Sequence, residues 1–191
     1  MSTPYEIKQV IVYRRDLNMR KGKIASQVAH ASMAVFFDNR MRVKDLSEGP
    51  DVNIAKWQLR NQAAKTLVIP LTEDMAVWVE GSFAKIVLTV ENEEDLMRVY
   101  TLANEAGLPV SLIIDAGNTE FKQRCPSCEG SGEVGIRVLG VPLPAHGKCQ
   151  QCGGSGKIGV PTRTAVAVGP AKRDEIDKIT GQKGAVPTKL P

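Results

Sequence analysis

Short apolar runs alternate with amphipathic stretches along most of this chain. Four runs rich in β-branched residues predict strands, at residues 7–13, 84–90, 108–115 and 162–170. Residues 23–41 carry Ala and apolar side chains at helical spacing, and residues 91–107 begin with acidic residues and end at a glycine, which predicts two helices. Strands that alternate with helices predict an α/β fold. We expect a three-layer α/β/α sandwich around a mixed four-stranded sheet.

The pattern is weaker between residues 38 and 80 and in the C-terminal tail. We expect a helix over 53–65, another over 72–81 that buries Trp78, and a short packed or extended piece at 67–71 between them. From residue 174 the tail is expected to form a short helical turn and then to fray.

Composition places the chain among ordinary globular proteins. It has 191 residues, which suits one domain with a small added module, and its hydrophobic fraction of 42% and charged fraction of 24% argue against disorder. A net charge of +4 is only a weak hint of a polyanionic partner. No apolar run approaches the ~20 residues that span a bilayer, and the first residues lack a signal-peptide pattern. We therefore expect no membrane association and a cytoplasmic location.

The cysteines form an internal repeat. The sequence CPSCEGSG at 125–132 and the sequence CQQCGGSG at 149–156 each contain the unit CxxCxGxG, and 20 residues separate the two CxxC pairs. In a reducing compartment such thiols are rarely disulfides. Four unliganded cysteines or a redox pair would leave the two copies unexplained. The pattern predicts a tetrahedral Zn²⁺ site with the ligands Cys125, Cys128, Cys149 and Cys152.

A closed Cys₄ site leaves no open coordination position, so this zinc is expected to be structural. The repeat resembles half of the cysteine-rich region of DnaJ-type chaperones, although no J-domain pattern accompanies it. We expect a zinc-ribbon-like module at 121–159 to be inserted into a domain formed by residues 1–120 and 160–191.

Polar residues near the predicted strand ends and the first helix are candidates for chemistry. Lys23 and its basic neighbours lie where helix N-terminal N–H groups favour anions, so a phosphate could bind there. Asp115 ends a predicted strand, a common place for chemistry in α/β folds. Each has a plainer interpretation, because Lys23 suits a solvated surface and Asp115 could simply start a turn.

Several blocks together resemble the archaeal and eukaryotic type of peptidyl-tRNA hydrolase. They are KQVIVYRRDLNMRKGKIASQVAHA at 8–31, AKIVLTV at 84–90, GLPVSLIIDAGNTE at 107–120, TRTAVAVGP at 162–170 and IDKITG at 176–181. The resemblance covers about two-thirds of the chain. It implies an enzyme that hydrolyses the ester between peptide and tRNA, needs no cofactor for catalysis, and has peptidyl-tRNA as its partner; a homodimer stays open.

The resemblance also assigns residues. It places the catalytic positions at Lys23, Gln27, Asp115, Thr119 and Thr164, and substrate contacts at Arg20, Lys21 and His30. Asp115 is expected to orient a water molecule and Lys23 to stabilise negative charge, or the two to act together as a base. Gln27 and a threonine, Thr119 or Thr164, are expected to position substrate oxygens.

Two other functions remain open at this point. The fold could bind tRNA or a protein without turnover, with the zinc module as its working surface, or the chain could be a zinc-dependent, chaperone-like interaction protein. The polar set around Asp115 argues against a pure binding module. Since the module lies between Thr119 and Thr164, we expect it to start at the rim of the site and to extend the substrate-facing surface.

Overall fold

A computed structural model of the chain describes residues 6–37, 42–45, 65–69, 71–138 and 141–191. The elements of the main domain are β1 (Ile7–Arg14), α1 (Lys21–Phe37), β2 (Arg42–Asp45), β3 (Lys65–Val68), α2 (Glu73–Glu80), β4 (Lys85–Val90), α3 (Glu93–Glu105), β5 (Val110–Asp115), β10 (Thr162–Lys172) and α4 (Arg173–Asp177). Between β5 and β10 lie β6 (Lys122–Arg124), β7 (Glu133–Val138), β8 (Val141–Lys148) and β9 (Lys157–Gly159).

The central sheet has four strands in the order β4-β1-β10-β5. β1 is parallel to β4 and antiparallel to β10, and β10 is antiparallel to β5. The mixed four-stranded sheet is therefore as expected. Since β1, β4 and β5 all run in one direction, their carboxyl ends meet the amino end of β10 at one end of the sheet. This is where open α/β sheets place their ligands.

Side chains of alternate residues in β1 and β10 enter two separate buried clusters. One contains Ile11, Ala165 and Ala167 with Ala31 and Val35 of α1 and Met75 of α2. The other contains Val10, Val12, Val166 and Val168 with residues of α3 and α4. Both central strands are thus buried on two sides, which explains why their sequences are continuous β-branched runs with no polar alternation.

Local signals fix the helix boundaries. The side chain of Asn92 accepts a hydrogen bond from the N–H of Asp95 (2.8 Å), which caps α3, and acidic residues fill its first turn. Thr72 caps α2 in the same way through the N–H of Met75 (3.2 Å). Trp78 is 1% exposed, as expected, and its indole N–H donates to the Ala84 carbonyl (2.9 Å).

The two edges of the sheet differ. The C-terminal tail covers the β4 edge, because Thr89 and Lys189 exchange backbone hydrogen bonds of 2.8 and 3.1 Å. Val186 and Thr188 of this tail are buried. The expectation that the tail frays is therefore wrong: Val186 enters the cluster beneath α3 and α4 and anchors the segment. In the described part of the chain, no strand pairs with the outer edge of β5.

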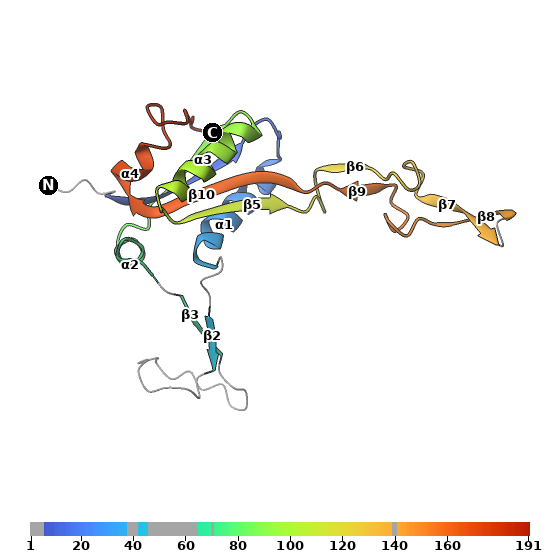
Figure 1. Cartoon of the computed structure of the whole chain (residues 1–191), viewed down its shortest axis with the longest axis horizontal. Coiled ribbons are helices and arrows are strands. Elements are labelled where there is room, and N and C mark those ends of the chain that lie inside the picture. Colours follow the sequence, from blue (N-terminus) through green and yellow to red (C-terminus); the bar gives the residue numbers. More distant parts are fainter. Residues whose placement is uncertain (1–5, 38–41, 46–64, 70, 139–140) are drawn as a thin grey trace.

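Residues between β5 and β10 form an arm that projects from the end of the sheet (Figure 1). β6 pairs with β9 next to the sheet, and β7 pairs with β8 farther out. The four cysteines lie between these two ribbons in sequence. The arm continues the direction of β5 and β10, so it leaves the main domain from the end at which the carboxyl ends of the parallel strands meet.

The remaining expectations have mixed outcomes. All four predicted strands and the helices at α1, α2 and α3 are present, and α4 forms the expected helical turn. β10 does not end at Gly169-Pro170; an irregularity in its pairing with β1 between Lys8 and Val10 accommodates the two residues, and the strand runs on to Lys172. The helix expected at 53–65 falls outside the described residues except for Lys65, which begins β3. No described helix has both the length and the apolar character to cross a membrane.

Candidate active site and metal centre

A cleft of about 720 Å³ lies between the amino-terminal half of α1 and the carboxyl end of β5. Its lining residues are Arg20, Gly22, Lys23, Ser26, Gln27 and His30 from the α1 side, and Ile113, Ile114, Asp115, Ala116, Asn118, Thr119 and Glu120 from β5 and the loop after it. Six of the eight predicted site residues line this cleft, and a seventh, Thr164, lies behind one of them, Gln27. Lys21 is exposed and lies outside the lining.

All five predicted catalytic residues belong to one hydrogen-bonded chain. Lys23 Nζ donates to Asp115 Oδ2 and to Thr119 Oγ1 (3.3 Å). Gln27 Nε2 donates to the same Asp115 oxygen (3.0 Å), and the Thr164 hydroxyl donates to Gln27 Oε1 (2.5 Å). The residues come from α1, β5, the loop after β5 and β10, so the sheet topology and not sequence proximity brings them together.

Thr164 occupies a different position from the one expected. Its side chain is fully buried (0% exposed), and it does not line the cleft. The expectation that it could position a substrate oxygen directly is therefore wrong, and Thr119, which is exposed at the rim, is the threonine that can do so. Thr164 acts instead behind Gln27, whose amide it orients toward Asp115.

The Asp115 carboxyl group is held ionised. Burial would raise its pKa, but hydrogen bonds from Lys23, the Gly117 N–H (2.8 Å, to Oδ1) and Gln27, together with the charge of Lys23, outweigh burial and hold the pKa below its ordinary value of 3.8. At neutral pH this group is therefore a carboxylate that accepts hydrogen bonds and a weak base.

Counting the unused hydrogen-bonding capacity shows what the site can offer a substrate. A carboxylate accepts about four hydrogen bonds, and Asp115 receives one from each of Lys23, Gln27 and Gly117. One acceptor site remains, on Oδ1. Among the described residues, the Lys23 ammonium uses two of its three N–H donors, and the Thr119 hydroxyl accepts from Lys23 while its own hydrogen has no acceptor. One acceptor beside two donors suits a water molecule and a developing oxyanion.

The residues expected to meet tRNA differ in their availability. Arg20 is 78% exposed and forms an ion pair with Glu120 (2.6 Å) across the cleft mouth. A phosphate would have to compete with Glu120 for this guanidinium. His30 is exposed on the cleft wall, and Lys21 is exposed at the start of α1.

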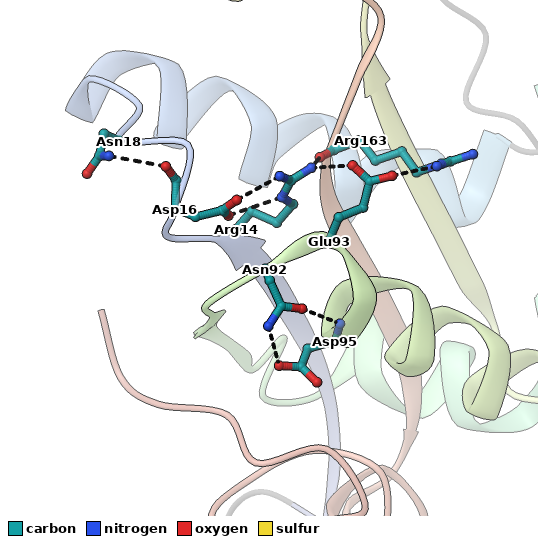
Figure 2. A network of polar contacts seen from close by, with 7 residues as sticks. All are labelled: Arg14, Asp16, Asn18, Asn92, Glu93, Asp95 and Arg163. Carbon is teal, nitrogen blue, oxygen red and sulfur yellow. Dashed lines mark hydrogen bonds and ion pairs between the residues drawn. The ribbon is translucent and has the colours of Figure 1, made fainter.

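An ion-pair network, which the sequence alone did not reveal, joins the end of β1 to the start of α3 and to β10 (Figure 2). Arg14, 9% exposed at the end of β1, donates to Asp16, to Glu93 (2.6 Å) and to the Arg163 carbonyl (3.2 Å). The hydrogen bond to Asp16 raises the pKa of Arg14, which burial partly opposes. Arg163 binds the other Glu93 oxygen (2.6 Å). The network fixes the backbone of β10 directly before Thr164. The sequence did contain a signal for it, because Arg14 is a charged residue at the end of a buried strand.

Gly117 is a second feature that the sequence did not single out. Its φ is +74°, and a Cβ here would lie 2.4 Å from the Val160 nitrogen, so only glycine fits. This close approach holds the outgoing and returning segments of the arm together at its base. It also directs the Gly117 N–H toward Asp115. The base of the arm therefore lies directly beside the cleft, whose lining includes Ala116 and Asn118 on either side of Gly117.

The four cysteine side chains meet in the arm. Their Sγ atoms all lie within 4.8 Å of one another, with Cys125–Cys149 at 3.8 Å and Cys128–Cys152 at 3.7 Å. These separations exceed a disulfide bond, about 2.05 Å. Four sulfurs at about 2.3 Å from a central Zn²⁺ in a tetrahedron lie about 3.8 Å apart. The sulfur positions therefore fit one tetrahedral metal ion.

The two cysteine repeats contact each other reciprocally. Cys125 N–H donates to the Gly156 carbonyl and Cys149 N–H to the Gly132 carbonyl, both at 2.9 Å. The N–H groups of Gly132 and Gly156 each donate to a cysteine sulfur at 3.3 Å. Burial raises the pKa of Cys125 to about 11, whereas at Cys152 burial is outweighed by hydrogen bonds, first from Gly156 and Gly154, which lower its pKa to about 6. Such N–H donors stabilise thiolate ligands.

Comparison with known proteins identifies a family and several relatives of this chain. The model of the family "Peptidyl-tRNA hydrolase PTH2" matches residues 7–132. The peptidyl-tRNA hydrolase of Sulfolobus acidocaldarius is 32% identical over 126 residues, covering 66% of this chain and 86% of the relative. That of Aeropyrum pernix is 34% identical over 133 residues, covering 69% and 87%. That of Methanocaldococcus jannaschii is 28% identical over 176 residues, covering 92% and 96%.

The matched residues include β1, α1, β5 and the loop to Thr119, and thus Lys23, Gln27, Asp115 and Thr119. The match covers well over half of the chain, and several relatives exceed 30% identity across most of their own length. The chain therefore belongs to the PTH2 family of peptidyl-tRNA hydrolases.

Proposed function

We propose that the protein hydrolyses peptidyl-tRNA at the cleft between α1 and β5, with Asp115 and Lys23 as the central pair. The family assigns the reaction: the ester bond between peptide and tRNA is cleaved by water. The observation that supports this location most strongly is the continuous chain of hydrogen bonds through Thr119, Lys23, Asp115, Gln27 and Thr164. The two buried clusters on the sheet support the three-layer sandwich that carries it.

Asp115 orients the attacking water. The free acceptor site on Oδ1 takes one O–H of the water, whose oxygen then faces the ester carbonyl. Because its pKa lies below the ordinary value, the carboxylate gains a proton only as the transition state forms. The water oxygen bonds to the carbonyl carbon and the bond to the ribose oxygen breaks. The two protons of the water end on the ribose oxygen and on the new peptide carboxyl group.

Lys23 and Thr119 stabilise the oxyanion. The third N–H of Lys23 and the hydroxyl hydrogen of Thr119 form no hydrogen bond with another described residue, so both can donate to the substrate. Donors fixed before the reaction stabilise developing negative charge without reorganising. Gln27 and Thr164 hold the Asp115 carboxylate in place. The ion pair of Lys23 and Asp115 thus supplies a positive charge beside the oxyanion and a carboxylate beside the attacking water.

A binding module without turnover is the alternative. It would use the same cleft for tRNA and would leave Asp115 without a task. A carboxylate in a site for a polyanion weakens binding by charge repulsion, so its presence there is better explained by a role in the reaction. This argument, with the family membership, favours the enzyme.

A hydrolysis assay separates the two functions. Purified protein is incubated with a peptidyl-tRNA that carries a labelled peptide, with and without a mild chelator. Release of labelled peptide in both conditions is expected, because no residue of the cleft belongs to the cysteine cluster. Protein that binds the tRNA yet releases no peptide in either condition would establish the binding module.

The cysteine cluster is proposed to hold one structural Zn²⁺ in an inserted module, residues 121–159. The sulfur separations and the N–H donors to the thiolates support this. Four thiolates fill a tetrahedral shell, so the ion would contribute to folding and leave the hydrolysis to the cleft.

The base of the arm is proposed to extend the contact with tRNA. Arg124 of β6 lies directly opposite Lys157 of β9, and Lys122, two residues from Arg124, shares its face of the ribbon. None of the three forms an ion pair with another described residue. Like charges opposite each other destabilise a ribbon. A phosphate backbone lying on this face would remove that repulsion.

The salt dependence of tRNA binding tests the role of the arm. The double variant Arg124→Gln, Lys157→Gln is expected to lower the slope of log Kd against log salt concentration by about 1.5. Lys183→Gln, an exposed lysine of the tail, serves as the control and should leave the slope as it is. An equal slope in the unaltered protein, the double variant and the control would mean that these arm residues do not contact tRNA.

A further inference from the structure

The outer edge of β5 offers backbone hydrogen bonds beside the reacting groups. β5 is the last strand of the sheet, and no described strand covers its outer side. The opposite edge, by contrast, is paired with the tail at Thr89 and Lys189. Proteins usually protect such edges, because an open one binds further strands.

The pairing register shows which groups of β5 point outward. The Gly169 N–H donates to the Pro109 carbonyl (2.7 Å), so Val110 and Val168 form a non-hydrogen-bonded pair. Hydrogen-bonded and non-hydrogen-bonded pairs alternate along an antiparallel ladder. The pairing is irregular between Arg163 and Ala165, but the extra residue lies on β10, so β5 keeps this alternation. The N–H and C=O groups of Leu112 and Ile114 therefore point away from β10, toward the open edge.

Two hollows lie along this edge between β5 and α1. The catalytic cleft touches Ile113 and Ile114, and a second hollow of about 290 Å³ touches Ser111 and Leu112. Neighbouring strand residues point to opposite faces of a sheet. A hollow that touches both members of such a pair must open at the strand's edge.

One face of α1 forms the other wall of both hollows. Ser26 and His30 line the catalytic cleft, and Ala34 and Phe37 line the second hollow. Their spacing of three or four residues places all four on one side of the helix. The wall changes along its length from polar beside Asp115 to apolar near the end of α1.

The chemistry of the substrate matches this seam. Peptidyl-tRNAs share one ester but carry peptides of many sequences, so a general hydrolase must hold the peptide through groups that every peptide has. Backbone N–H and C=O groups meet that need, and strand addition to a sheet edge uses only these.

We propose that the peptide part of the substrate binds as an added strand on the outer edge of β5. The inference rests on the proposed hydrolysis at Asp115. The carboxyl end of the peptide carries the ester, so it lies at Asp115, which is also the carboxyl end of β5. The peptide therefore runs parallel to β5, and its earlier residues reach the hollow at Leu112 and Phe37.

Substrates of different length test this site without altering the protein. N-acetyl-aminoacyl-tRNA is compared with a tetrapeptidyl-tRNA that has the same tRNA and the same last residue. Strand addition predicts a kcat/KM at least about tenfold higher for the tetrapeptide, from two or more added hydrogen bonds. Equal values for the two substrates would overturn the proposal, while hydrolysis of the short one would still establish the enzyme.

N-methylation of single amides supplies an internal control. Successive amides of a strand point in opposite directions, so methylating one should abolish most of the tenfold gain and methylating its neighbour should preserve it. An equal effect at neighbouring positions would contradict strand pairing.

A variant of β5 tests the same contact from the protein side. Leu112→Pro removes the outward N–H, which makes no ladder bond to β10, and edge positions tolerate proline. Leu112→Ala removes the side chain and keeps the N–H. The ratio of kcat/KM for the tetrapeptidyl-tRNA to kcat/KM for the short substrate should fall at least about threefold more in the proline variant than in the alanine variant. Equal losses would contradict the contact, and if the proline variant does not fold, the methylation series decides.

Discussion

The catalytic cleft and the cysteine arm are both built from residues far apart in sequence, but they are held together differently. The cleft rests on a core: its polar side chains project from α1, β5 and β10, which pack around Ile11, Ala165 and Ala167. The arm has little apolar support, since among its described side chains only Val134 and Ile158 pack against the four cysteines. A change in the cleft should therefore alter chemistry and spare the fold, whereas a change at the cysteines should unfold the arm and spare the chemistry.

Removing Lys23 is expected to have a large effect on the cleft side of this comparison. Lys23→Ala deletes an oxyanion donor and the partner of Asp115, so kcat should fall by about 10²–10³. The protein should stay folded, with Tm lowered only by the loss of this ion pair. Single-turnover kinetics and thermal unfolding measure the two. Lys183→Ala, an exposed lysine of the tail, is the matched control. A rate within threefold of the unaltered protein would remove Lys23 from the mechanism.

Removing one cysteine tests the other side. Cys128→Ser should lose the proposed zinc ion and the exchange protection of the arm amides, because three thiolates bind such an ion less firmly than four. The rate of hydrolysis at subsaturating tRNA should fall only several-fold, because the arm would no longer contribute to tRNA binding. Metal analysis, hydrogen exchange and kcat/KM give the three readouts, with Ser127→Ala as the control. Loss of kcat at saturating tRNA, matching the Lys23 variant, would break the comparison.

Low pH should weaken the cleft by a smaller amount. Asp115 has a pKa below its ordinary value of 3.8, so its ion pair contributes full stability above that value and loses it as pH falls through the lower pKa of the folded protein. Urea unfolding between about pH 2 and pH 6 should show the stability difference between the protein and Asp115→Asn shrinking toward the acid end. A difference that stays constant over this range would mean that Asp115 is not held ionised by its partners.

The sequence predicted the sheet and the metal cluster because their signals are local. β-branched runs identify strands, and the CxxCxGxG unit contains both its ligands and its glycines. Lys23, Gln27, Asp115 and Thr119 also lie in recognisable blocks. Those blocks could not show which of them would touch, because that depends on β10 lying between β1 and β5.

What the sequence missed depends on contacts between distant residues. The burial of Thr164 follows from α1 lying over β10, and the role of Arg14 follows from Glu93 at the start of α3. The tail seemed free to fray because GQKGAVPTKLP has little periodicity. Two buried side chains, Val186 and Thr188, and the backbone pairing at Thr89 hold it in place.

The rate of the chemical step in Asp115→Asn tests the central claim most directly. Labelled peptidyl-tRNA at low concentration is mixed with saturating protein, and peptide release is followed in one turnover while tRNA binding is measured in parallel; Asp174→Asn, an exposed carboxylate of α4, is the control. We predict that Asp115→Asn binds the tRNA within a few-fold of the unaltered protein and releases peptide at least about 10³ times more slowly. Release at the unaltered rate, with binding unchanged, would contradict the account.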